Sequence, residues 1–366
     1  MKKVLIGMSG GVDSSTSAAM LIERGYEVVG ATLKLTESED ESFIDDAKKV
    51  AEKLGIKHVV LDFRKEFAEK VEDYFANEYL NGRTPNPCAV CNFEIKFGLM
   101  LDYALSIGCD FLATGHYASV VHDSETGKWL LKKTDSKKDQ TYFIYRLNQH
   151  QLSHAIFPLA EFEKTKVREI AEKFDLPVAH KSESQDICFV KGETHYEFIK
   201  RYKKIEPKLG NFINEEGKIL GPHKGIINYT VGQRRHLGIA LGEHAYVKKI
   251  DTLSNSIVLG NKESGKSTCL FADHINLISI DSIPEEGLKA FAKVRSRASE
   301  VLCKIYPGEK VKVVFENPIY FPAPGQSIVF YDEKGFVIGG GFICWNFGLI
   351  LCMIVFKSNF VVLKSD

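Results

Sequence analysis

Apolar and polar residues follow one another in two kinds of block along the first half of the chain. Short apolar runs at residues 4–6, 27–33, 58–62 and 111–114 predict buried strands. Segments with apolar residues at helical spacing predict helices at residues 16–24, 42–54, 67–79, 95–106 and 162–174. Alternating strands and helices are typical of a doubly wound parallel sheet. We therefore predict an α/β fold here, with its ligands at the carboxyl ends of the strands.

The pattern changes from about residue 210, where apolar runs become shorter and turn residues recur. Residues 311–315 and 327–331 read as strands, and turns such as 322–325 and 333–335 separate such segments. Short strands between regular turns favour a small antiparallel barrel or sandwich. We predict a catalytic domain (1–202), a small central domain (203–268), a C-terminal β-barrel-like domain (269–341) and an irregular apolar tail (342–366).

The tail contains an apolar stretch at residues 342–356, which is only about fifteen residues long. A membrane-spanning helix needs roughly 20 apolar residues. We interpret the stretch as a strand with an irregular extension rather than a membrane anchor.

Composition narrows the class of protein. The 366 residues are 44% hydrophobic and 26% charged, which is typical of a globular protein with a sizeable core. The formal net charge is zero, so a nucleic-acid partner must be met by a local basic surface. The first strand follows Met1 almost at once, which leaves no room for a presequence, so we expect a cytoplasmic protein. Its eight cysteines are then reduced, and a cysteine motif favours catalysis or metal binding over disulfides.

A glycine-rich turn joins the first predicted strand to the first predicted helix. Its residues 7–15 read Gly-Met-Ser-Gly-Gly-Val-Asp-Ser-Ser. Small residues let backbone N–H groups approach an anion, the helix N-terminus adds partial positive charge, and an aspartate there can hold Mg²⁺ beside phosphates. No lysine follows the second glycine, so this is not a Walker loop. Residues 260–267 do match the Walker pattern, but a turn and a strand follow them, so we interpret that match as accidental.

Cysteines mark two further candidate sites. Cys88 and Cys91 form a CxxC in the segment 81–92, where two prolines and a glycine predict a loop without regular structure. A structural zinc site would need a second pair of ligands, and the chain has no second CxxC. Cys188, between Ile187 and Phe189, would alone read as a packing residue. Its polar neighbours at 182–186 indicate a site instead.

Taken in order, seven motifs resemble the bacterial tRNA-specific 2-thiouridylases, members of the N-type ATP pyrophosphatase (PP-loop) superfamily. The resemblance runs from residue 1 to about residue 341, and its motifs are residues 7–14, 84–87 with Cys91-Asn92, 113–117, 138–142, 184–189, 229–234 and 324–327. It implies ATP-dependent 2-thiolation of the wobble uridine of tRNA, with AMP transferred to O2 of the uracil and sulfur supplied by a cysteine persulfide. It also implies ATP and Mg²⁺ as cofactors, tRNA and a persulfide sulfur-donor protein as partners, and a monomer.

The resemblance assigns roles to individual residues. Cys188 carries the persulfide and Cys91 is the second nucleophile. The target base, turned out of the anticodon loop, contacts Asn86, Pro87 and Cys88. The residues expected at ATP are Gly7, Met8, Ser9, Gly10, Gly11, Val12, Asp13, Ser14, Leu33 and Gly115. The residues expected at tRNA are His116, Lys138, Asp139 and Gln140 from the first domain, and Arg295, Ser296 and Gln326 from the β-domain. Basic clusters at 234–236 and 293–297 support such contacts.

Some alternatives stay open at this point. Reactive thiols need a lowered pKa, which the start of a helix near Phe93 would give Cys91, whereas no activator of Cys188 is evident. Cys88 stands where some relatives carry an aspartate thought to assist proton transfer, so Cys88, Cys91 and Cys188 could instead hold an iron–sulfur cluster. A PP-loop synthetase acting on a small molecule, or a tRNA-binding protein without catalysis, also fits part of the pattern.

Overall fold

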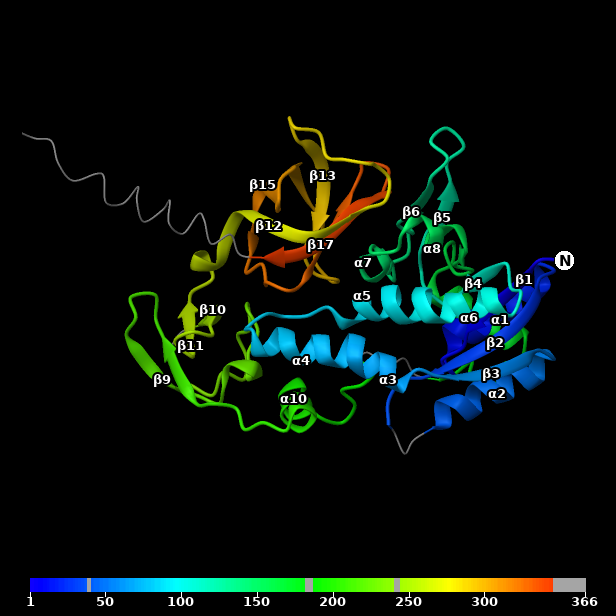
Figure 1. The fold of residues 1–366 in the computed structure, drawn as a ribbon, viewed down its shortest axis with the longest axis horizontal. Coiled ribbons are helices and arrows are strands. Elements are labelled where there is room, and N and C mark those ends of the chain that lie inside the picture. The colour runs from blue at the N-terminus through cyan, green and yellow to red at the C-terminus, as the bar shows by residue number, and fades with distance from the viewer. Residues whose placement is uncertain (38–40, 182–186, 240–243, 345–366) are drawn as a thin grey trace, which may run out of the picture.

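The computed structural model describes residues 1–37, 41–181, 187–239 and 244–344. A five-stranded parallel sheet lies at one end of the molecule, a small β-domain at the other, and a barrel rises beside the helices that join them (Figure 1). The sheet has the order β3-β2-β1-β4-β7. Its strands are β1 (Lys3–Gly7), β2 (Glu27–Lys34), β3 (Lys57–Asp62), β4 (Phe111–Ala113) and β7 (Ala155–Ile156). The predicted α/β fold is confirmed, and β7 is a strand that the pattern did not reveal.

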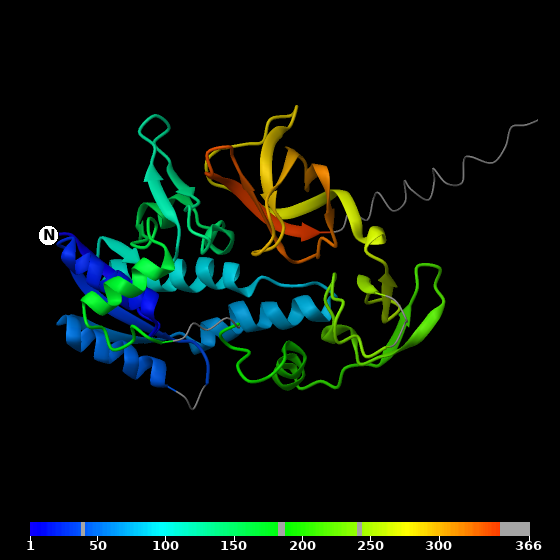
Figure 2. The same cartoon turned by 180° about the vertical axis from the view of Figure 1, so that it is seen from behind.

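Side chains of β1 alternate between two apolar cores on the two faces of the sheet. Val4 and Ile6 pack with α1, α2 and α9, whereas Leu5 packs with α6. Figure 2 shows α9 on the face turned away from the viewer of Figure 1. These helices are α1 (Val12–Glu23), α2 (Ser42–Leu54), α9 (Lys164–Lys173) and α6 (Met100–Ser106). Because β1 ends at Gly7, the glycine-rich turn that follows it lies at the carboxyl edge of the sheet.

Two composite helices run side by side away from the sheet (Figure 1). The first consists of α3 (Arg64–Phe67), the π-helical η1 (Ala68–Glu72) and α4 (Asp73–Leu80). The second consists of α5 (Pro87–Cys91), the π-helical η2 (Asn92–Leu99) and α6. The prediction of an irregular loop over 81–92 is wrong from Pro87 onward, because that proline occupies the first helical position, where its missing N–H costs nothing.

The remaining elements build the two β-domains and their connections. The central domain is a four-stranded sheet of order β10-β11-β8-β9 with α10 beside it. The barrel is closed and antiparallel, in the order β12-β15-β14-β13-β16-β17. The bounds are α10 (His195–Lys203), β8 (Gly210–Ile213), β9 (Ile219–His223), η3 (Ile226–Asn228), β10 (Tyr246–Asp251), β11 (Ser256–Gly260), η4 (Glu263–Gly265), β12 (Lys266–Leu277), β13 (Leu288–Lys293), β14 (Val301–Tyr306), β15 (Val311–Tyr320), β16 (Ser327–Tyr331) and β17 (Val337–Cys344). A hairpin and two short helices precede β7, namely β5 (Ser119–His122), β6 (Trp129–Lys132), α7 (Thr141–Ile144) and α8 (Gln149–Ser153).

The structure also bears on the Walker-like segment and on the apolar tail. The Walker-like segment ends in a short 3₁₀ turn and β12, with no helix after it, which confirms that the match is accidental. Residues 342–344 belong to β17, as the predicted strand requires, and the rest of the tail lies outside the described residues. In the described part of the chain, no helix is both long and apolar enough to traverse a bilayer.

The barrel holds the segment that leads into α5. Thr84 N–H donates to the Pro324 carbonyl (2.7 Å), and the Gln326 amide donates to the Pro85 carbonyl (3.0 Å). The Asn86 amide donates to Ser327 Oγ (2.9 Å), so the beginning of the helix is fixed by the last strands of the barrel. Val329, Tyr331 and Val337 of the barrel also share one apolar cluster with Leu5 of the sheet. The sheet domain and the barrel are therefore one packed body.

Candidate active site

The turn after β1 forms a cradle at the carboxyl edge of the sheet. Gly10 has φ +68° and lies against the backbone of Phe43, where a Cβ would come within 2.4 Å of the carbonyl oxygen. Only glycine fits this position without displacement. Gly11 is the N-cap of α1, and the first N–H groups of that helix have no partner within the helix. Ser14 Oγ accepts from Ser9 N–H (3.1 Å) and donates to the Gly11 carbonyl (3.2 Å). This arrangement can bind a phosphate.

Asp13 lies in the first turn of α1 and is about one-third exposed. Its Oδ1 accepts from the Tyr117 hydroxyl (2.8 Å) and from Lys164 Nζ (2.7 Å), which extends from the start of α9. The carboxylate and the serine hydroxyls are the hard oxygen donors that Mg²⁺ prefers, so these residues fit the ion. Sequence reasoning missed Lys164, because its position 151 residues away gave no sign that α9 begins beside α1.

Other residues expected at ATP occupy the same edge. A Cβ on Gly115 would come within 2.9 Å of Ser14 N, so the turn after β4 packs directly on the first turn of α1. Leu33 is half-buried near the end of β2. Met8 and Val12 point into the core, so only their backbone is available to a nucleotide. The structure thus brings the expected ATP residues to one edge, and their contact with ATP stays a prediction.

The three candidate cysteines meet between the two composite helices and the segment after residue 187. Cys88 occupies the second helical position of α5 and Cys91 its last, so Cys91 lies in a helix and not in the expected loop. The thiols are mutually within electrostatic range, because the charge of Cys188 raises the pKa of both Cys88 and Cys91. Cys88 and Cys188 are exposed, whereas Cys91 is buried. Cys91 shares an apolar cluster with Phe189, and Ile187 packs against that cluster, so the segments that carry Cys91 and Cys188 pack together although they are far apart in the sequence.

Burial dominates the chemistry of these thiols. It raises the pKa of Cys91 to about 12, and it raises the pKa of Cys88 and of Cys188, which protein atoms surround closely despite their exposure. The expected lowering of the Cys91 pKa is thus wrong, because the loss of solvent raises this pKa more than the partial positive charge at the start of α5 lowers it. Lys96 opposes the effect at all three thiols, and Lys191 opposes it at Cys188. Neither lysine is recognisable as an activator from its position in the sequence.

The iron–sulfur alternative requires three thiolates close enough to share one cluster. No set of three or more His, Cys, Asp or Glu side chains within the described ranges is arranged to hold a metal ion, and this includes the three cysteines. The residues present therefore do not fit a cluster in this conformation. The seven cysteines in the described ranges are free thiols.

The residues expected at the flipped base and at tRNA are not equally accessible. Asn86 is buried, accepts from Ala89 N–H (3.3 Å) as the N-cap of α5, and is held by Ser327. His116 is buried between Phe97 and Phe157, and its Nδ1 pairs with Thr114 Oγ1 (2.7 Å). Burial lowers the pKa of His116 well below its ordinary value, so the ring is neutral. In this conformation the His116 ring contacts protein, and its contact with tRNA stays a prediction.

Other expected tRNA residues serve the fold as well. Gln140 accepts from Tyr117 N–H (3.0 Å), and Asp139 accepts from Thr141 Oγ1 (2.7 Å), while Lys138 is exposed. Arg295 donates to the Phe321 carbonyl, and Gln326 accepts from the Tyr142 hydroxyl (3.2 Å). Pro87 is buried, and Ser296 is half-buried. Pro87 adjoins Cys88 in α5, and Gln326 reaches the same segment through the Pro85 carbonyl.

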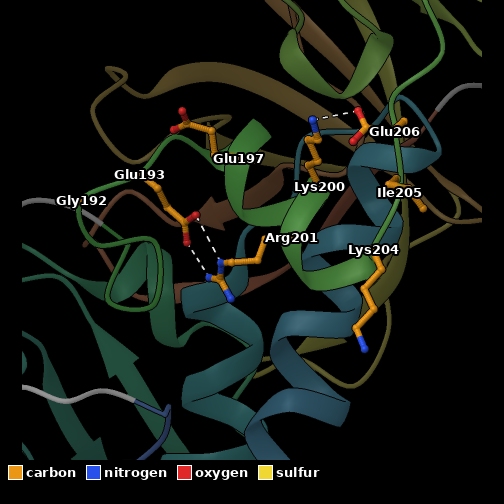
Figure 3. A pocket seen from close by; sticks show the side chains of 8 residues that line it. All are labelled: Gly192, Glu193, Glu197, Lys200, Arg201, Lys204, Ile205 and Glu206. Carbon is orange, nitrogen blue, oxygen red and sulfur yellow. Dashed lines mark hydrogen bonds and ion pairs between the residues drawn. The ribbon is translucent and has the colours of Figure 1, made fainter.

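A separate open recess of about 580 Å³ lies beside α10 (Figure 3). Its charged side chains pair among themselves, as in Arg201 with Glu193 (2.6 Å) and Lys200 with Glu206 (2.8 Å). Neither the glycine-rich turn nor a cysteine lines it, so we do not assign it to the reaction.

Glu72, at the end of η1, gives a prediction about stability. Its pKa is raised to about 7, mainly by burial, and its charge acts on Cys188. The folded pKa exceeds the unfolded one, so the cost of ionising this carboxyl in the folded protein is absent below about pH 4.5 and complete above about pH 7. Glu72→Gln should therefore gain about 1–2 kcal/mol over the parent between pH 4.5 and pH 8, after allowance for solvent screening.

Urea denaturation of both proteins at the two pH values measures this difference. The matched control is Glu69→Gln, because Glu69 is exposed on the same segment and its burial changes little on folding. An equal gain from both variants, or none from Glu72→Gln, contradicts the burial of a costly charge.

Comparison with known proteins covers nearly all of the chain. Residues 2–192 match the family model "tRNA methyl transferase HUP domain", residues 196–261 the "tRNA methyl transferase PRC-barrel domain" and residues 267–343 the "Aminomethyltransferase beta-barrel domain". A protein named tRNA-specific 2-thiouridylase MnmA from Acetivibrio thermocellus is 48% identical over 93% of this chain and 99% of its own. One of the same name from Clostridioides difficile is 46% identical over 93% and 98%. The solved NMN synthetase from Francisella tularensis is 16% identical over 57% of this chain and 79% of its own, with a TM-score of 0.33, too low to carry an argument.

Proposed function

The chain belongs to the family of tRNA-specific 2-thiouridylases, and we propose that it replaces O2 of the wobble uridine of tRNA with sulfur in an ATP-dependent reaction. The observation that carries the proposal is the packing of Cys91 in one apolar cluster with Ile187 and Phe189, the neighbours of Cys188, in a body that also holds a pyrophosphate-type turn. ATP and Mg²⁺ are the cofactors. A persulfide sulfur-donor protein is the partner, and the enzyme acts as a cytoplasmic monomer.

The first step activates the uracil. Its O2 attacks the α-phosphorus of ATP, the bond to the bridging oxygen of the β-phosphate breaks, and pyrophosphate leaves. In this proposal, N–H groups at the start of α1 and the hydroxyls of Ser9 and Ser14 stabilise the charge on the phosphates. Lys164, now paired with Asp13, adds a cation at the same position. Mg²⁺ held through Asp13 would neutralise further phosphate charge.

The second step transfers sulfur. The terminal sulfur of the Cys188 persulfide attacks C2 of the adenylated base and AMP leaves with O2, which gives a disulfide between C2 and Cys188. The Cys91 thiolate then attacks Sγ of Cys188, the 2-thiouracil leaves as its thiolate, and a Cys91–Cys188 disulfide forms. A thiol reductant restores both cysteines, and the donor protein supplies the next persulfide. The packing of Cys91 in one cluster with Ile187 and Phe189 supports this exchange, which requires the sulfurs of Cys91 and Cys188 to come into contact.

Contacts with tRNA come from exposed basic residues in this proposal. Lys138 of the first domain and Arg234 and Arg235 of the central domain are exposed. Phosphate contacts of this kind make affinity fall with salt and position the anticodon loop. Asn86, Pro87 and Cys88 would then meet the flipped base where α5 begins.

Reconstitution tests the function. The purified chain, unmodified tRNA, Mg-ATP and a persulfide donor should yield 2-thiouridine, detected by mass spectrometry of tRNA nucleosides, with one AMP formed per sulfur inserted. AMP formation should require tRNA. Exchange of pyrophosphate into ATP without tRNA would favour a small-molecule synthetase, and binding of tRNA without AMP release would favour a protein without catalysis.

A further inference from the structure

Lys96 is a half-buried cation that lacks an acidic partner in the described part of the chain. A half-buried ammonium without a counter-ion is costly unless a negative charge forms beside it. Lys96 lies within electrostatic range of the three thiols and of His116, and its charge opposes the rise in the pKa of Cys88, Cys91 and Cys188 alike. A thiolate formed during sulfur transfer would therefore be the partner that Lys96 lacks.

The helix register decides whether Lys96 can face the cysteines. Lys96 follows Cys91 by five positions, and in an α-helix residues five apart point to different sides. Residues 92–99 are π-helical, with hydrogen bonds between residues five apart, so one turn holds an extra residue and brings Lys96 round towards the Cys91 side. Side chains in helices lean towards the N-terminus, which favours an approach of the Lys96 ammonium to the thiols at the start of this composite helix. Gly98 shows the same register, because its Cβ position lies 3.1 Å from the Phe93 carbonyl.

A π-helical segment displaces backbone carbonyls from their usual partners, and here one buried side chain compensates for this. Gln151, from α8, donates its amide to the carbonyls of Phe93 (3.1 Å) and Phe97 (2.9 Å). Its Oε1 accepts from Asn148 N–H (3.1 Å), so the whole carboxamide is satisfied and oriented. Both carbonyls belong to η2, within one turn of Lys96.

We propose that Gln151 is a positioning residue: its carboxamide holds the π-helical register of residues 92–99, and this register directs the Lys96 ammonium at the three thiols. The inference deepens the proposed thiolation and rests on it for its purpose. The other groups that face these partners are His116 near Lys96, and Lys191 and Glu72 near Cys188. No hydrogen bond in the described part of the chain joins them to Gln151, so a change at Gln151 leaves them in place.

Thiol alkylation tests the inference on the full chain without tRNA, ATP or sulfur donor. Iodoacetamide modification of Cys88, Cys91 and Cys188 is followed by peptide mass spectrometry from pH 6.5 to 10. Gln151→Met keeps the volume and removes the amide, and we expect alkylation at pH 8 to fall about 3–10-fold, with the pH profile moved upward. Lys96→Met should give the same shift, and Gln151→Met should add little in the Lys96→Met background.

Gln149→Met is the matched control, because Gln149 lies in the same helix but donates to Trp129 and Ile278 instead of η2. Gln151→Glu keeps the bond from Asn148, so it serves if Gln151→Met does not fold. The inference is overturned if the alkylation profile of folded Gln151 variants is unchanged. It is also overturned if Gln149→Met shifts the profile as much as Gln151→Met does, or if Gln151→Met causes its full shift in the Lys96→Met background. Because the readout needs no catalysis, an inactive chain that shows the shift would refute only the proposed function.

Discussion

Cys188→Ser is expected to abolish 2-thiouridine formation while tRNA-dependent release of pyrophosphate continues. A serine hydroxyl cannot carry a persulfide, so sulfur transfer should fall by about 10³-fold or more. In the proposed mechanism the adenylation step uses the turn at residues 7–15, apart from Cys188, so its rate should stay within about twofold of the parent. Nucleoside mass spectrometry and a pyrophosphate assay on the same reaction separate the two steps.

Cys269→Ser provides the control, because Cys269 is partly exposed on β12 of the barrel and takes no part in the thiol cluster. It should retain both activities. Full thiolation by Cys188→Ser would remove the persulfide assignment. Loss of pyrophosphate release together with thiolation would show that Cys188 is needed before sulfur transfer.

Gly10→Ala should reduce tRNA-dependent adenylation on the order of 10²-fold by misplacing phosphate contacts. The φ of +68° at Gly10 disfavours any side chain, and a Cβ would overlap the Phe43 carbonyl. The turn after β1 must therefore shift away from Phe43. The strained backbone should also cost about 1–3 kcal/mol of folding free energy. Pyrophosphate release measures the first effect, and thermal unfolding measures the second.

Gly25→Ala separates the effect of the steric overlap from the effect of the unfavourable backbone conformation. Gly25 also has positive φ (+81°), but its Cβ position is open and it lies just beyond the far end of α1. This variant should lose some stability and keep its adenylation rate. Equal losses of adenylation from both variants would mean that general destabilisation, and not the shape of the cradle, controls the reaction.

The sequence predicts the parallel sheet well because hydrophobic periodicity directly records burial. It also predicts that residues after β1 and β4 share one edge, which Gly115 and Ser14 confirm by packing together. The sequence does not predict the start of α5 correctly. A proline interrupts a helix in its interior but is favoured at the first helical position, and only the preceding Asn86 cap indicates that Pro87 begins a helix.

What the sequence could not predict depends on burial and on distant contacts. Cys91 was expected to ionise readily, and its pKa is instead raised, because tertiary packing removes water from the thiol. Lys96, Lys164 and Gln151 are ordinary polar residues in the chain, and their importance comes from what the fold places next to them. A π-helical register has no simple hydrophobic period, so its effect on Lys96 could not be read from spacing.

The hold of the barrel on Thr84, Pro85 and Asn86 has a consequence for biosynthesis. The contacts come from residues 324–327, and β17 completes the closed barrel at Cys344, so the geometry around the thiols depends on residues that are synthesised long after residues 84–91. A nascent chain can assemble the turn at residues 7–15 early, yet the proposed sulfur chemistry must wait until the barrel has been synthesised. Partly synthesised chains would then be unable to modify tRNA or to expose a primed persulfide to the wrong acceptor.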